Sequence, residues 1–210
     1  MSQHDFILLD RSGSMLHNWQ ETLQAVNAYV KTLAEEETPT LVTLAVFDGQ
    51  AGRCTFDVVR NSVAPKDWAP VNNSDAAPRG WTPLSDAIGK IVSLANAEPY
   101  EKVALIIMTD GAETGSTLTV PQAKRLLQEC RDKGWQVIML GADFDNTEQS
   151  RGLGNLAAQS ATVSAGNMVG TMTATASMRG LYGSGAALNM AYSPEQQAQW
   201  RSKTTNSSNS

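Results

Sequence analysis

Short apolar runs alternate with amphipathic stretches along most of the chain, and this alternation limits the folds that the chain can adopt. Five runs have the length and the aliphatic content of buried strands. They are residues 5–10, 41–48, 54–59, 102–110 and 135–142. Apolar strands that alternate with helices are typical of a mostly parallel sheet covered by helices on both faces. We therefore expect an α/β fold with three layers, a sheet between two layers of helices.

Three of the stretches between these runs have helical periodicity. Their apolar residues recur three and four positions apart, which places them on one face of a helix. The last stretch also has a proline at its start and a glycine at its end, the usual arrangement around a helix. The stretches are residues 19–37, 83–97 and 121–134. We expect each of them to cover a face of the sheet.

One connection is too short to hold a helix. Residues 49–53 join the second and third runs and have the length of a hairpin loop. The third run is therefore expected to be an antiparallel strand at an edge of the sheet.

The pattern weakens beyond residue 143. There we expect a short helix in 147–159, a last short strand in 161–165 and a helix rich in small residues in 167–188. Asp143 is expected to cap a helix. We expect one domain over residues 1–192, followed by a polar, disordered tail at 193–210.

The net charge of −5 gives no electrostatic reason to expect a nucleic acid or an anionic membrane as partner. The first ten residues show no basic region followed by an apolar region, and no run of about 18 apolar residues occurs, so we expect a cytoplasmic protein. Cys54 and Cys130 form no C-x-x-C motif and are expected to be reduced thiols. The two histidines, at positions 4 and 17, make no cluster for zinc.

Small oxygen-bearing side chains stand where the first and fourth runs end and where the helix at 83–97 begins. Ligands of open α/β sheets bind outside the carboxyl ends of the strands, so we expect these side chains to meet there. The set consists of Asp10, Ser12, Ser14, Thr82 and Asp110. Two carboxylates and three hydroxyls are the hard oxygen ligands that Mg²⁺, Mn²⁺ and Ca²⁺ prefer. Two carboxylates would balance one divalent ion and leave a coordination position open for a carboxylate from another molecule.

The motifs DRSGS at 10–14, TP at 82–83 and TDG at 109–111, in this order, resemble the von Willebrand factor A (VWA) domain with its metal-ion-dependent adhesion site, MIDAS. The resemblance extends over about residues 5–190 and is greatest to small bacterial and phage-type cytoplasmic versions. It implies a Rossmann-like α/β/α sandwich with an antiparallel edge strand. It also implies that Ser12, Ser14 and Thr82 ligate a metal, with Asp10 and Asp110 near the ion directly or through water.

The function that the resemblance implies is a non-enzymatic, metal-dependent protein-interaction module. The metal, expected to be Mg²⁺, would bind an Asp or Glu side chain of a partner protein. Relatives in bacteria also suggest a MoxR-type AAA+ ATPase as a possible partner.

Other interpretations of the same residues stay open. Ser12, Ser14 and Thr82 could cap helices, and Asp110 with the following glycine could form only a turn. A metal-dependent hydrolase or phosphotransferase could use the same crevice. However, position 12 is a serine where an aspartyl-phosphate enzyme needs an acid, and the chain offers no obvious general base. A structural or assembly component of a phage or cytoplasmic complex is a third possibility.

Overall fold

The computed structural model describes residues 2–142, 152–154 and 156–201. Its strands form one six-stranded sheet in the order β3-β2-β1-β4-β5-β6. The strands are β1 (Gln3–Asp10), β2 (Leu41–Gln50), β3 (Arg53–Val63), β4 (Lys102–Thr109), β5 (Gln136–Ala142) and β6 (Ser160–Val163). All neighbouring strands are parallel except β2 and β3, which are antiparallel. The expected sheet, with an antiparallel strand at its edge, is thereby confirmed.

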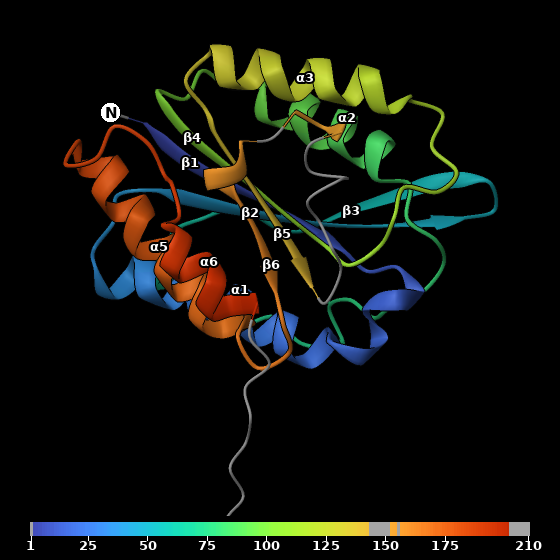
Figure 1. The fold of residues 1–210 in the computed structure, drawn as a ribbon, viewed down its shortest axis with the longest axis horizontal. Helices are drawn as coiled ribbons and strands as arrows, with labels where there is room; N and C mark the ends of the chain where they lie inside the picture. Colours follow the sequence, from blue (N-terminus) through green and yellow to red (C-terminus); the bar gives the residue numbers. More distant parts are fainter. Residues whose placement is uncertain (1, 143–151, 155, 202–210) are drawn as a thin grey trace, which may run out of the picture.

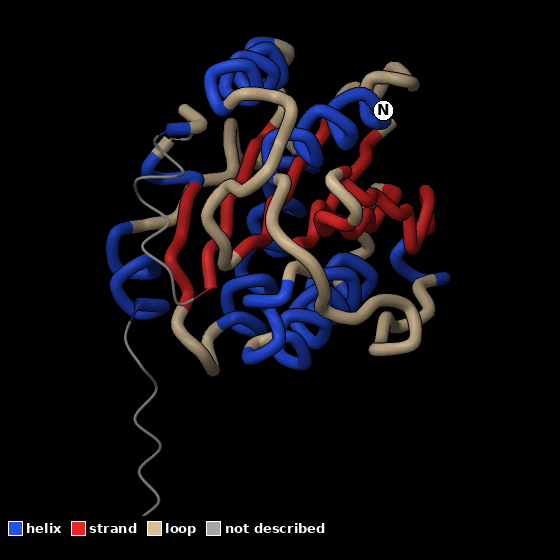
Figure 2. The backbone as a smooth tube through the Cα atoms, turned by 90° about the vertical axis from the view of Figure 1, so that its right-hand side faces the viewer, coloured by secondary structure: helices blue, strands red, loops and turns tan. Residues whose placement is uncertain are grey.

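Helices cover both faces of the sheet (Figure 1, Figure 2). One face is covered by α2 (Leu84–Ala95) and α3 (Val120–Asp132). The other is covered by α1 (Trp19–Glu35), α5 (Met168–Ser184) and α6 (Pro194–Arg201). Three short 3-10 helices complete the described elements: η1 (Gly13–His17), η2 (Pro65–Asp67) and η3 (Ala157–Gln159). The molecule is the expected α/β/α sandwich.

The central strand β1 is buried along its whole length. Its side chains alternate between the two faces: Ile7 and Leu9 pack with α1 and α5, whereas Phe6 and Leu8 pack with α2 and α3. Because both faces are covered, the strand reads as a continuous apolar run instead of an alternating one.

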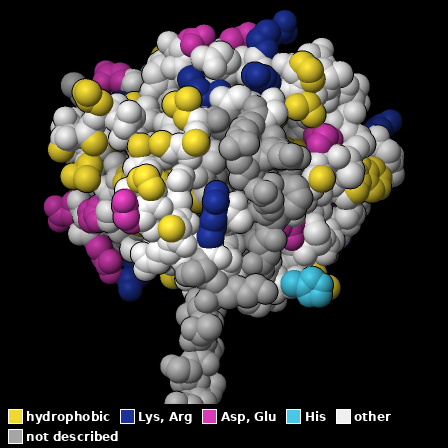
Figure 3. Space-filling model, in the orientation of Figure 1, with side chains coloured by type: hydrophobic (Ala, Val, Ile, Leu, Met, Phe, Trp, Pro, Cys, Tyr) yellow, Lys and Arg dark blue, Asp and Glu magenta, His cyan; other side chains and the backbone are white. Residues whose placement is uncertain are grey.

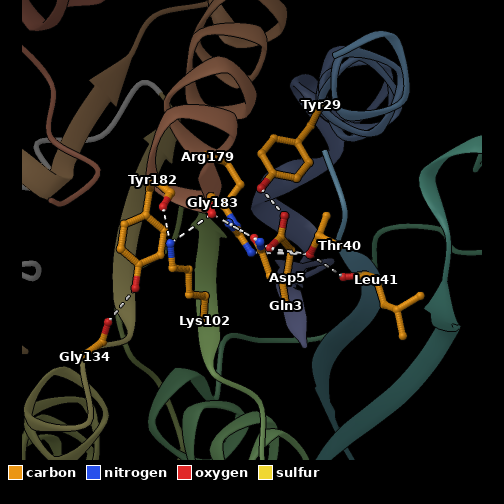
Figure 4. A network of polar contacts seen from close by, with 10 residues as sticks. All are labelled: Gln3, Asp5, Tyr29, Thr40, Leu41, Lys102, Gly134, Arg179, Tyr182 and Gly183. Carbon is orange, nitrogen blue, oxygen red and sulfur yellow. Dashed lines mark hydrogen bonds and ion pairs between the residues drawn. The ribbon is translucent and has the colours of Figure 1, made fainter. Parts of the chain in front are cut away.

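A buried polar network ties α5 to the amino ends of the strands (Figure 4). Arg179 is fully buried, and its Nε donates to Asp5 Oδ1 at 2.5 Å. The Tyr29 hydroxyl donates to the other oxygen of Asp5, at 2.7 Å. Lys102 Nζ donates to the carbonyl oxygens of Tyr182 and Gly183 at 2.8 and 2.9 Å. The network joins the first strand of the chain to its last long helix.

The structure corrects the expected boundary at residue 192. Residues 194–201 form α6 and do not belong to a disordered tail. Trp200 is buried, meets the ring of Tyr192 edge to face at 5.0 Å and accepts the Ser164 N–H at its carbonyl oxygen. A single buried aromatic residue therefore anchors a segment whose composition is polar. Residues 202–210 lie outside the described part.

Other expectations beyond residue 142 fall partly outside the described residues. Asp143 does, and so do residues 147–151 and 155 of the expected helix at 147–159, of which 157–159 form η3. The last strand covers 160–163, and the following helix covers 168–184.

No helix in the described ranges is long and apolar enough to span a bilayer. On the face drawn in Figure 3, acidic and basic side chains are interspersed.

Candidate metal centre

The five candidate oxygen ligands come from three segments at the carboxyl end of the sheet. Asp10 is the last residue of β1, and Ser12 and Ser14 follow in the turn that enters η1. Asp110 directly follows β4, the neighbour of β1 in the sheet. Thr82 lies in the loop before α2. Parallel pairing of β1 and β4 brings the ends of both strands to the same edge.

The Asp10 carboxylate is fully buried and accepts hydrogen bonds from two neutral donors. The Ser12 backbone N–H lies 2.7 Å from Oδ1, and the Thr109 hydroxyl lies 2.7 Å from Oδ2. The pKa of Asp10 is raised to about 6. Burial is the main cause, and the nearby Asp110 carboxylate contributes a smaller part of the increase. The ionised form of Asp10 is thus costly in this environment, and a nearby cation would favour it.

The hydroxyls of Ser12 and Ser14 connect Asp10's loop to Asp110. Their Oγ atoms are 3.0 Å apart, and Ser14 Oγ donates to Asp110 Oδ1 at 2.6 Å. Ser14 and Asp110 are 96 positions apart in the chain. The structure therefore brings together oxygen atoms that the sequence shows only as separate motifs.

Gly111 lets the Thr82 loop approach the other two segments. A Cβ atom at this position would lie 2.6 Å from Thr82 Oγ1 and 3.4 Å from Ser14 Oγ. The Thr82 loop is also fixed by its backbone, because Thr82 N–H donates to Thr114 Oγ1 at 3.0 Å and Thr114 N–H donates to the Thr82 carbonyl at 2.8 Å. All five predicted residues thus meet around one point of the sheet edge.

The capping interpretation finds no support at two of its three positions. The N-cap of α2 is Pro83, and the Ser85 and Asp86 N–H groups of its first turn donate to Glu113 and Ser116, not to Thr82. Ser12 stands at the N-cap of η1, but its hydroxyl makes no cap hydrogen bond. The hydroxyl of Ser14 points to Asp110. The hydroxyls of Ser12 and Ser14 therefore make hydrogen bonds within the cluster.

The chemistry of the donor set fits a hard cation. The set holds two carboxylates and three hydroxyls, and the described residues contain no group of three or more His, Cys, Asp or Glu side chains placed to hold a metal. Zinc sites are usually built from thiolate and imidazole ligands, whereas Mg²⁺, Mn²⁺ and Ca²⁺ take oxygen ligands.

Beside the site, the structure places two charged residues that the sequence interpretation did not assign to it, Asp48 and Arg79. Asp48, at the carboxyl end of β2, is fully buried and accepts hydrogen bonds from Arg11 and Arg79. The signal that could have revealed it is simple. The second apolar run, like the first, ends in an aspartate.

The model of the von Willebrand factor type A domain family matches residues 6–177 of the chain. The chain belongs to this family. No curated protein matches it in sequence.

Solved structures agree with this VWA fold. The pilus adhesin SpaC from Lactobacillus rhamnosus GG superimposes with a TM-score of 0.67 at 14% identity, covering 86% of this chain and 31% of that one. Manganese-loaded TRAP protein of Plasmodium vivax has a TM-score of 0.59 at 14% identity, with 80% and 71% covered. A von Willebrand factor type A protein from Catenulispora acidiphila has a TM-score of 0.57 at 14% identity, with 85% and 42% covered. This VWA domain therefore spans about a third of the SpaC chain, and identities this low establish the fold alone.

Proposed function

We propose that this VWA domain is a non-enzymatic, metal-dependent protein-interaction module. Mg²⁺ held by a MIDAS made of Asp10, Ser12, Ser14, Thr82 and Asp110 would bind an Asp or Glu side chain of a partner protein. The observation that carries the proposal is the contact of Ser14 Oγ with Asp110 Oδ1, at 2.6 Å, beside Ser12 and Thr82. Mn²⁺ and Ca²⁺ suit the same ligands.

Each residue has a distinct part in this proposal. The carboxylates of Asp10 and Asp110 balance the charge of one divalent ion, and the hydroxyls add neutral oxygen ligands. The bound ion would supply an electrophilic position that a partner's carboxylate can occupy. Metal binding in the family is supported by the manganese-loaded TRAP structure, and protein interaction by the pilus adhesin.

A metal-dependent hydrolase or phosphotransferase is the alternative function, and the placement of the histidines disfavours it. His4 is buried on β1, near the end of the strand opposite the cluster, and His17 is exposed on η1. Hydrolysis needs a base positioned against the attacking water. A role as an assembly component of a larger complex would use the same surface. The cytoplasmic location and a MoxR-type AAA+ ATPase as partner stay predictions.

The test begins with protein stripped of metal by a chelator. Mn²⁺ is titrated by calorimetry, and the proton relaxation rate of water reports whether the bound ion keeps a coordination position open to solvent. We expect binding by the wild type, an enhanced relaxation rate, and a fall in that rate on adding glutarate but not the uncharged glutaramide.

Two variants serve as a matched pair in the same titration. Asp110→Asn is expected to abolish Mn²⁺ binding, whereas Asp67→Asn, which removes an exposed aspartate on η2, is expected to leave it unchanged. The proposal is wrong if the stripped wild type binds no Mn²⁺. It is also wrong if glutarate leaves the relaxation rate of the bound ion unaltered.

A further inference from the structure

The strand β2 contributes none of the proposed metal ligands, yet its last acidic residue touches both loops beside them. Asp48 is fully buried. Its Oδ1 accepts a hydrogen bond from Arg11 Nε at 2.9 Å, and its Oδ2 accepts one from Arg79 Nε at 3.1 Å. Arg11 lies between two of the proposed ligands, Asp10 and Ser12. One carboxylate thus holds a side chain from each loop.

We propose that Asp48 is a positioning residue of the metal centre. It fixes the distance between the loop at 11–14, which carries the serines, and the loop at 79–82, which carries the threonine. This inference rests on the proposed function, because it concerns how the same centre is held in shape.

The backbones of the two loops are in direct contact. Arg79 N–H donates to the Arg11 carbonyl at 2.7 Å, and Gly13 N–H donates to the Gly80 carbonyl at 3.1 Å. The arginine side chains extend from this contact to the same carboxylate. Loss of the carboxylate would therefore remove the buried side-chain link that joins the two loops beside these backbone hydrogen bonds.

The loop at 79–82 is also pressed against the end of β2. Gly49 N–H donates to the Trp81 carbonyl at 2.7 Å, in an isolated β-bridge. Gly80 has a φ of +69°, and a Cβ there would lie 2.1 Å from the Gly49 carbonyl oxygen and 3.2 Å from Asp48 Oδ2. Only glycine fits this close approach without strain. The end of β2 therefore packs directly against the loop at 79–82 and supports it.

The chain offers a control for the charge of Asp48. Asp57 on β3 also pairs with Arg11, but its side chain is 53% exposed and lies 3.9 Å from Arg79 Nη2. Removal of either carboxylate takes one negative charge from the neighbourhood of the centre. A long-range effect on a cation would be similar for both. A positioning effect is expected to be larger for Asp48, because Asp48 is buried and hydrogen-bonded to both arginines, whereas Asp57 is hydrogen-bonded to Arg11 and lies beyond hydrogen-bond distance of Arg79.

Arg79 gives a second test with an opposite electrostatic expectation. Removing a positive charge near a cation site strengthens cation binding through Coulomb's law. If Arg79 instead holds the threonine loop through Asp48, its loss weakens binding. Arg79→Gln therefore separates the two explanations by the sign of the change, and Arg79→Lys, which keeps the charge and a donor, is expected to restore part of the affinity.

The experiment is calorimetric titration of Mn²⁺ into stripped wild type and the variants. Loss of a residue that orients metal ligands typically costs about 10–100-fold in affinity, which we expect for Asp48→Asn. Arg79→Gln is expected to weaken binding in the same direction. Asp57→Asn is expected to stay within about threefold of wild type, because Arg11 keeps its pairing with Asp48 and the Asp57 side chain is half-exposed to solvent. Equal affinities for Asp48→Asn and Asp57→Asn, or tighter binding by Arg79→Gln, would overturn the inference.

Hydrogen exchange of the metal-free proteins provides a readout that needs no ion. Asp48→Asn is expected to speed exchange at the amides of Gly13 and Arg79 relative to Asp57→Asn. If the wild type binds no Mn²⁺, the proposed function fails, and unchanged exchange at these two amides then also overturns the role of Asp48. If Asp48→Asn does not fold, Arg79→Gln decides the question, because the Arg79 side chain is 45% exposed.

Discussion

Asp5 and Asp10 are both buried on β1, and the two carboxylates have different partners. Asp5 receives the buried guanidinium of Arg179 at 2.5 Å. Asp10 accepts hydrogen bonds from a backbone N–H and from the Thr109 hydroxyl, both of which are neutral. The charge of Asp5 is thus balanced by the Arg179 guanidinium, whereas the Asp10 carboxylate is stabilised only by neutral hydrogen-bond donors. The same strand carries one carboxylate suited to structure and one suited to binding a cation.

Asp10→Asn is expected to stabilise the metal-free protein at neutral pH. Burial raises the pKa of Asp10 from 3.8 to about 6, so its contribution to stability is fully present below pH 3.8 and is lost as the pH rises through 6. At about 1.36 kcal/mol for each pKa unit, the loss is roughly 3 kcal/mol. Urea denaturation with chelator at pH 7.5 should show the variant to be more stable than wild type, and added Mg²⁺ should stabilise only wild type. An equal gain from Mg²⁺ in both proteins would contradict the prediction.

His4→Gln is expected to reduce the acid sensitivity of the fold. His4 donates to or accepts from Thr43 Oγ1 at 2.8 Å and stacks on Phe6 at 4.2 Å, and burial lowers its pKa from 6.5 to about 4. Its contribution to stability is therefore fully present above pH 6.5 and is lost as the pH falls through 4, by at most about 3 kcal/mol. Denaturation between pH 7 and pH 4 should show a smaller loss in the variant. Parallel curves for the two proteins would count against it.

The effects of Asp10 and His4 have opposite signs over overlapping pH ranges. The pH dependence of the wild type alone cannot separate them. Subtracting the stability curve of each variant from that of wild type gives the contribution of each residue.

Gly111→Ala is expected to weaken Mn²⁺ binding at least about tenfold, the scale seen when ligand positions are disturbed. The added methyl group would lie 2.6 Å from Thr82 Oγ1 and must displace it from the other ligands. Gly170→Ala is the control, because a Cβ on Gly170 in α5 meets nothing within 4 Å. That variant should bind Mn²⁺ normally and gain about 0.5–1 kcal/mol of stability as a helical alanine. Normal metal affinity in Gly111→Ala would show that the three segments need not approach so closely.

Arg179→Met is expected to lower the free energy of unfolding by about 3–5 kcal/mol, since it leaves the Asp5 carboxylate buried without its cation. The double variant Asp5→Asn with Arg179→Met should lose less than the sum of the single variants, because neither charge then remains. Chemical denaturation of the three proteins measures this coupling. The Mn²⁺ affinity of the folded variants should match wild type, because Asp5 lies near the opposite end of β1. Strictly additive losses would argue against a coupled pair.

The sequence was sufficient to predict that the five candidate residues lie together, because four of them follow strand ends that the apolar pattern marks and Thr82 precedes a predicted helix. Asp10 and Asp110 close such runs, and parallel pairing then brings them together. Asp48 closes a run in the same way, but its role depends on two arginines whose side chains reach it from different loops. Local spacing carries no information on such a contact.

The missed features at the C-terminus have a different physical cause. Arg179 lies in a helix of small residues, and an arginine in such a helix is ordinarily expected to face solvent. It is buried here because its guanidinium pairs with the buried carboxylate of Asp5 on β1. The polar segment 194–201 is held by the buried Trp200 and by hydrogen bonds of Gln197 to the carbonyl oxygens of Ala157 and Ser160. In both cases long-range contacts outweigh the composition of the surrounding segment.

The pairing of Asp5 with Arg179 also bears on how the chain matures at the ribosome. The two residues are 174 positions apart, so β1 is made long before the cation that neutralises it. At typical rates of synthesis, about 5–20 residues per second, the interval is roughly 10–35 seconds. Throughout that time the Asp5 carboxylate has no guanidinium from α5 to pair with. The docking of α5 against β1 therefore belongs to the last stage of translation or follows release.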